Sequence, residues 1–202
     1  MSYASWVTPN KVSGSGNDTV SWTGSVHTGR SSRTTTATFA ASGVSPDKTL
    51  TIVQAGKAEF VDIDDTASVA QGGGSVTITG TSNSPKLTFT LTGSNDIGLV
   101  LPASYLANSV STNNGAAIAG DPGATQEYAF SITFTGIGAN TGLSDLVSQL
   151  TITADNGTTD TCTITQAAAS PYLTISPTTI NLDAAGTAVS VSVSSNTSWT
   201  IS

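Results

Sequence analysis

The stretch TLTIVQA at residues 49–55 returns as TCTITQA at residues 161–167, so that Gln54 and Gln166 stand 112 positions apart. In both copies apolar and polar side chains alternate, which places one face of a strand in a core and the other in water. The same alternation recurs along the chain, for example at residues 76–78, 87–91, 130–134 and 189–193. A repeat of this length indicates tandem domains, because solenoid repeats are shorter.

The composition fits an all-β protein of sandwich modules. Of the 202 residues, 9% are charged and 37% are hydrophobic. The charged share is far below the ordinary value of about 25%, and Thr, Ser and Gly take its place. Turn sequences separate the short alternating runs, as in residues 13–18, 72–74, 121–123 and 155–157. Short strands at this spacing predict antiparallel sandwiches.

The phase of the repeat sets the domain boundaries. Residues 58–167 form one complete module, with a long insertion at 93–127. Residues 1–57 match only the second half of such a module, and residues 168–202 match only the first half. We therefore expect two sandwich equivalents, one continuous and one divided between the two ends of the sequence.

The divided module carries the motifs of a known family. SNTSWTIS at residues 195–202 surrounds Trp199, and a second tryptophan, Trp6, precedes the turn SGSGN at residues 13–17. RTTTATF at 33–39 and IVQAG at 52–56 follow. In this order the segments resemble the BACON domain, an immunoglobulin-like module of Bacteroidetes surface proteins and of phages that infect them. The resemblance implies tandem immunoglobulin-like β-sandwich modules. It is weaker in the middle module, where Lys86 and Leu87 replace the first tryptophan.

The two halves admit three interpretations. They complement each other within one chain, as in a circular permutant, or they pair between subunits by strand addition. The third interpretation is a fragment of a longer tandem array. Each half alone would expose strand edges and an apolar face, which favours aggregation unless a partner covers it.

Little in the sequence supports catalysis. The only histidine is His27, and the only cysteine is Cys162, which lies in an alternating run and is expected to be a buried structural thiol. Asp62, Asp64 and Asp65 lack the spacing of a calcium loop, and nothing places Glu59 near Glu127 as a hydrolytic pair. We therefore expect no enzyme activity, no catalytic residue, no metal and no cofactor.

The balance of charge and hydropathy limits the partners. The net charge is −7 with six Lys and Arg residues, so no basic stripe for nucleic acid is present. No apolar run reaches the roughly 20 residues of a membrane span, and residues 1–6 show no secretion signal. We expect neither nucleic-acid binding nor membrane insertion. The partners expected instead are further copies of the chain, other virion proteins and surface glycans.

Three groups of residues are candidates for contact. Trp22 is the candidate ligand-facing aromatic, since aromatic rings stack on sugars. Trp6 and Trp199 match fold positions of the family and are expected to pack between modules. Within the insertion, apolar residues either contact a partner or cap their own domain: Leu99, Leu101, Tyr105 and Leu106.

A helical turn is also expected over residues 143–150, where the apolar positions share a helical face.

The expected function is structural. A phage virion decoration, head-fibre or auxiliary capsid protein, displayed on the particle surface, agrees best with the resemblance and with the Thr/Ser/Gly-rich composition. The alternative is a carbohydrate- or mucin-binding adhesion module on a bacterial cell surface, if the chain is a fragment.

Overall fold

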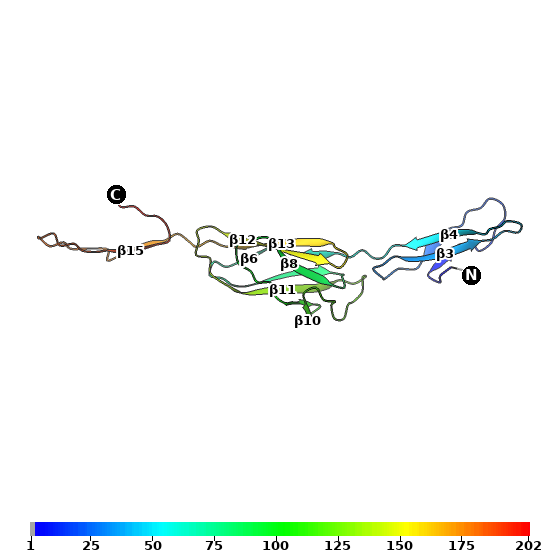
Figure 1. Ribbon diagram of the computed structural model, residues 1–202, viewed down its shortest axis with the longest axis horizontal. Helices are drawn as coiled ribbons and strands as arrows, with labels where there is room; N and C mark the ends of the chain where they lie inside the picture. The colour runs from blue at the N-terminus through cyan, green and yellow to red at the C-terminus, as the bar shows by residue number, and fades with distance from the viewer. Residues whose placement is uncertain (1–2) are drawn as a thin grey trace.

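Strands are the only regular secondary structure in residues 3–202, the part of the chain that the computed structural model describes. Figure 1 shows an elongated molecule with three parts along its long axis. A sandwich occupies the middle, the N-terminal strands lie at one end, and a C-terminal hairpin lies at the other. Within these residues no helix is long and apolar enough to cross a membrane. The prediction of an all-β chain is confirmed.

The middle sandwich consists of two facing sheets. The first sheet has the order β10 (Val110–Asn113), β9 (Ser104–Ala107), β11 (Tyr128–Ile137), β7 (Gly74–Ser82) and β5 (Val61–Ile63). The second has the order β6 (Thr66–Val69), β13 (Thr159–Gln166), β12 (Leu146–Ala154) and β8 (Leu87–Asn95). All neighbours are antiparallel except β6 and β13, which run parallel.

The core of the sandwich follows from the alternation of apolar residues. Ile78 and Ile132 face it from the first sheet, and Leu150, Cys162 and Ile164 face it from the second, each at most 1% exposed. Burying one such aliphatic side chain contributes about 1.5–3 kcal/mol. The intervening threonines point outward, where Thr77 and Thr133 share a hydrogen bond of 2.9 Å between their hydroxyls.

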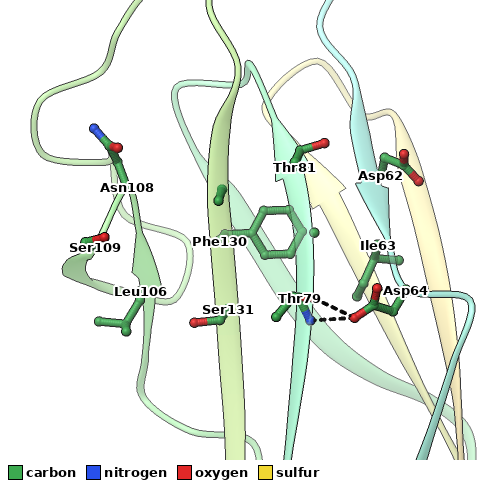
Figure 2. Close-up of a pocket in the computed structure, with 12 residues that line it drawn as sticks. Asp62, Ile63, Asp64, Thr79, Thr81, Leu106, Asn108, Ser109, Phe130 and Ser131 are labelled. Carbon is green, nitrogen blue, oxygen red and sulfur yellow. Dashed lines mark hydrogen bonds between the residues drawn. The ribbon is translucent and has the colours of Figure 1, made fainter.

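One glycine is required by the packing of this core. A Cβ at Gly80 would overlap the carbonyl oxygen of Asp62 and the ring of Phe130. Figure 2 shows the Phe130 ring lying across β7 at this point. The missing side chain therefore gives the aromatic ring its place against the strand.

The insertion at residues 93–127 folds back on its own sandwich. It contributes β9 and β10 to the first sheet. Leu99 and Tyr105 join the core at 5% and 3% exposure, and Tyr105 packs on Phe89 with ring centroids 4.7 Å apart. The insertion thus supplies extra strands and a cap to its own domain.

The helical turn predicted over residues 143–150 is wrong. Strand β12 begins at Leu146 and pairs with β13 on one side and β8 on the other. Ser148, Leu150 and Ile152 alternate into the core from this strand. Cross-strand pairing and burial override a local helical period of only two turns.

Three separate hairpins make up the two ends. At the N-terminal end, β1 (Val7–Pro9) pairs with β2 (Trp22–Gly24), and β3 (Arg33–Phe39) pairs with β4 (Lys48–Gln54). At the C-terminal end, β14 (Leu173–Ser176) pairs with β15 (Ser192–Ser195). Among the described residues no strand of one end pairs with a strand of the other, and the two ends lie far apart in Figure 1. The structure therefore does not show the halves completing each other within one chain.

Candidate functional site

The C-terminal hairpin reproduces the pairing of β5 with β7 in the middle sandwich. In β5 and β7, Val61 faces Ser82 and Ile63 faces Gly80. In β14 and β15, Leu173 faces Ser195 and Ile175 faces Val193. The offset is 112 residues in the first strand (173 − 61) and 113 in the second (195 − 82). The register is therefore the same in both copies.

An asparagine fixes the end of this hairpin in both copies. Asn83 Oδ1 accepts from the backbone N–H of Phe60 at 2.8 Å, and its Nδ2 donates to the carbonyl of Ala58 at 2.9 Å. Asn196 makes the equivalent bonds with Tyr172 at 2.9 Å and Ser170 at 3.0 Å. Local sequence thus folds the C-terminal segment as the first part of a module.

The N-terminal hairpin β3–β4 reproduces the last hairpin of the sandwich. Gln54 Nε2 donates to the carbonyl oxygen of Ser25 at 2.9 Å, as Gln166 Nε2 donates to that of Gly138 at 2.8 Å. The strand register is also shared, because Ala37 faces Leu50 where Leu150 faces Cys162. This segment is therefore folded as the last part of a module.

Equivalent positions differ sharply in burial. Cys162 is fully buried, whereas Leu50 at the same place in β4 is 38% exposed. Val61 is 8% exposed and Leu173 is 54% exposed. The difference arises because the C-terminal hairpin presents the inner face of a sandwich with no second sheet against it, and because the inner face of β3 and β4 is covered only in part, by Trp22 of β2 against Phe39. These two inner faces are the candidate functional site, and we call them the N-terminal open face and the C-terminal open face.

The N-terminal open face is hollow and aromatic. A cavity of about 500 Å³ is lined by Tyr3, Trp22, Ala37 and Phe39, among others. Trp22 packs edge-on to Tyr3 and Phe39, with centroid distances of 5.3 and 6.4 Å. Trp22 is half-buried. The candidate ligand-facing aromatic therefore packs from β2 onto the inner side of β3 and lines the cavity there.

The C-terminal open face carries several exposed apolar residues. Leu173, Ile175 and Leu182 are 54%, 50% and 63% exposed, and Trp199 is 47% exposed. A single exposed apolar residue is ordinary, but several within one short segment indicate a contact surface.

Trp6 and Trp199 stand apart within one chain. Trp6 lies under the guanidinium of Arg33, whose Cζ is 4.5 Å from the ring centroid. Trp199 follows β15 near the C-terminus and lines a shallow pocket together with Leu143. Their expected packing between modules stays a prediction.

The junction between the N-terminal segment and the sandwich is clamped by Arg30. Its guanidinium donates to both carboxylate oxygens of Asp121 at 2.7 and 2.8 Å, and to the carbonyl of Asn83 at 2.6 and 3.1 Å. Glu59 lies 4.0 Å from it. This contact raises the pKa of Arg30 and lowers the pKa of Asp121.

An equivalent backbone hydrogen bond is present at the junction on each side of the sandwich. Lys57 N–H donates to the carbonyl of Gly29 at 2.9 Å, and Ala169 N–H donates to that of Gly142 at 2.8 Å. The chain thus leaves the last strand of a module in the same way at both places.

The insertion residues proposed for partner contact divide into two groups. Leu99 and Tyr105 are core residues of the sandwich, and Leu101 is partly buried against that core. Leu106 is 47% exposed and faces outward from β9. Of the four, Leu106 alone offers substantial apolar surface.

Leu106 borders a polar groove of about 570 Å³ on the outer face of the first sheet, which Figure 2 shows. Asp62 and Asp64 flank it, and Asp64 accepts from the N–H and the hydroxyl of Thr79 at 3.0 and 2.7 Å. The groove contains carboxylates and hydroxyls without a basic group. Over residues 3–202, no three His, Cys, Asp or Glu side chains gather in a way that could hold a metal ion.

Cys162 and His27 both have surroundings that explain them as structural residues. Cys162 is fully buried as predicted, and burial, followed by the nearby Asp64, Asp65 and Asp160, raises the pKa of its thiol to about 11. Because a thiolate is the reactive form, this thiol is a poor nucleophile. His27 is half-buried, and its Nε2 lies 2.7 Å from the carbonyl oxygen of Ser31.

Comparison with known proteins adds no assignment to this geometry. No protein-family model matches the chain, and no curated protein matches it either.

Proposed function

We propose that the chain is a non-enzymatic structural protein that assembles through its two open faces. The observation that carries the proposal is the contrast between equivalent residues, Leu173 at 54% exposure against Val61 at 8%. A folded hairpin that presents its inner face gains stability when another sheet covers that face, because apolar area leaves water.

The setting proposed for this assembly is the surface of a phage particle, as a decoration, head-fibre or auxiliary capsid protein. The resemblance of the divided module to the immunoglobulin-like BACON domain supports this setting, together with the Thr/Ser/Gly-rich composition. On this proposal every module is immunoglobulin-like, and other virion proteins are partners besides the chain itself.

Sedimentation of lysates from cells that make the chain tests the assembly role. We expect the wild type to sediment in assemblies much larger than its 20.2 kDa. Leu50→Asp and Leu182→Asp, one on each open face, should shift the chain to its own mass. Leu106→Asp, on the outer groove, is the matched control and should behave as wild type.

Two results would contradict this role. If the wild type sediments as a single chain of 20.2 kDa under all conditions, the chain does not assemble. If Leu106→Asp alone disperses the assemblies, the contact lies on the outer groove instead of the open faces.

The second candidate function is carbohydrate binding, favoured by Trp22 in its half-open cavity. Aromatic faces pack on the apolar faces of sugar rings. A glycan array probed with the full chain tests it. Binding that Trp22→Ala abolishes and Trp199→Ala leaves intact would support adhesion, whereas a blank array would remove this candidate.

A further inference from the structure

We infer that the partner of each open face is a second copy of this chain: the N-terminal segment of one copy completes the C-terminal hairpin of the next. The inference rests on the proposed assembly role and names its partner. The middle sandwich is the template, since it contains the same two parts already packed against each other.

The template defines a register for the contact. In the sandwich, β6 pairs parallel to β13, with Ala67 opposite Ile164 and Val69 opposite Gln166. The C-terminal residues at the places of Ala67 and Val69 are Ile180 and Leu182, by the same offset of 113 that relates Ser82 to Ser195. In the completed module Ile180 therefore lies opposite Ile52, and Leu182 lies opposite Gln54.

The turn that follows supports this alignment. Gly73 and Gly186, also 113 residues apart, both have a positive φ, of 80° and 72°. Each donates its N–H to the carbonyl three residues earlier, Ala70 at 2.9 Å and Asp183 at 3.1 Å. The turn is thus formed in the same way in both copies, although the segment before it is a paired strand only in the sandwich and residues 179–182 pair with no strand.

Gln54 supplies a polar test of the fit. Gln166 Nε2 faces three carbonyl oxygens, those of Gly138 at 2.8 Å, Ala70 at 3.3 Å and Gln71 at 3.4 Å. Gln54 Nε2 donates to Ser25, the equivalent of Gly138. The other two carbonyls belong to the first part of a module. In the assembly they are those of Asp183 and Ala184 from the next copy.

The apolar surfaces are also complementary. The N-terminal open face offers Phe39, Leu50 and the cavity beside Trp22, and the C-terminal open face offers Ile180 and Leu182. Both sets lie where the template places core residues. Covering them removes apolar surface from water at both ends at once.

The shape of the molecule determines the kind of assembly. The two open faces lie at opposite ends of the long axis in Figure 1. A contact between different surfaces of identical subunits is heterologous, and where it does not close into a ring it continues as a filament. Each copy then contributes one continuous module and half of each of two shared modules.

A disulfide between two variants, each with one added cysteine, tests the register. Val53→Cys places a thiol on the outer side of β4, at the position of Thr165, which faces Ser68 in the template. Asn181→Cys is at the position of Ser68. Facing residues on neighbouring strands have Cα atoms about 5 Å apart, within the usual range for a disulfide. One variant carries a short tag, so that the mixed product is identified by its mass.

The expected result is a mixed dimer that forms at least about tenfold faster than with a mismatched pair. The mismatched control combines Val53→Cys with Thr174→Cys, which is exposed on β14, a strand that pairs with β15 and not with β4 in the predicted module. Buried Cys162 gives no competing product. Equal rates for the matched and mismatched pairs would overturn the register.

Light scattering on the purified chain tests the identity of the partner. We expect an open series of masses that grows with concentration, and at least about a tenfold weaker association for Leu182→Asp than for Leu106→Asp. Since Leu182 is 63% exposed in the single chain, its substitution should not unfold the hairpin, and circular dichroism checks this. A purified chain that stays monomeric overturns the inference, and large assemblies in lysates would then leave the proposed function standing with a different partner.

Discussion

Arg30 holds Asp121 through two parallel hydrogen bonds of 2.7 and 2.8 Å, from the N-terminal segment to the insertion of the middle sandwich. The same guanidinium reaches the carbonyl of Asn83, so one side chain connects three places. A two-pronged contact of this kind constrains direction as well as distance. The angle between the N-terminal segment and the sandwich therefore depends on this single arginine.

Arg30→Ala should release the N-terminal segment from its fixed angle. We expect a loss of about 1–2 kcal/mol of docking free energy, seen as separate alignment tensors for the two parts in residual dipolar couplings. Arg33→Ala is the matched control, because Arg33 contacts Gln54 and Ser25 within its own segment. A common tensor in Arg30→Ala would show that the clamp is not what holds the junction.

The junction should weaken in acid. The hydrogen bonds from Arg30 hold the pKa of Asp121 below its ordinary value of 3.8. A carboxylate with a lowered pKa adds stability above its ordinary pKa and loses it as the pH falls through the lowered value. The docking free energy should therefore fall below about pH 4. Because Asp18 and Asp183 also have lowered pKa values, the measurement is the difference between wild type and Asp121→Asn, and a flat difference would refute the assignment.

The two equivalent glutamines should differ in their effect on stability. Gln166→Ala removes a fully buried side chain that faces three carbonyl oxygens, and should lower the free energy of unfolding of the sandwich by about 2–4 kcal/mol. Gln54→Ala in the dilute chain should cost about 1 kcal/mol, since Gln54 is half-buried with fewer acceptors. Urea unfolding followed by circular dichroism measures both, and equal losses would mean that Gln54 is already fully partnered.

Gly80→Ala should disturb the core directly. The added methyl group overlaps the Phe130 ring and the Asp62 carbonyl, so we expect a loss of about 3 kcal/mol in thermal unfolding. Gly72→Ala is the control, since its Cβ meets nothing within 4 Å, and should change stability by less than about 0.5 kcal/mol. Similar melting temperatures for both variants would show that the Phe130 ring can move aside.

Cys162 should react with a thiol reagent only when the sandwich opens. Its burial and its pKa of about 11 both disfavour attack at pH 8. We expect at least a roughly hundredfold slower reaction than at the new thiol of Val53→Cys, which replaces a residue that is 62% exposed. Unfolding in guanidinium should equalise the two rates, and a fast native reaction would place Cys162 near the surface.

The sequence predicted the strands better than the contacts. The period of two and the repeated glutamine located β4 and β13, because alternation and turns are local properties. The helical turn at residues 143–150 failed since a short helical period loses to pairing with two neighbouring strands. The clamp by Arg30 was missed because Asp121 lies 91 residues away in a turn of the insertion, and no local pattern marks such a pair. The repeat in the sequence pairs Gln54 with Gln166, but only the structure shows which carbonyl oxygens this glutamine contacts.

The strands of both ends and of the sandwich run roughly along the long axis of the molecule in Figure 1. Tension along that axis would load the hydrogen bonds between neighbouring strands in shear, so that many bonds must break together instead of one after another. In a filament of such chains the parallel contact between residues 51–54 and 179–182 would bear the pull in this way. A contact loaded in shear resists stretching far better than it resists separation of one strand from its neighbour, bond by bond.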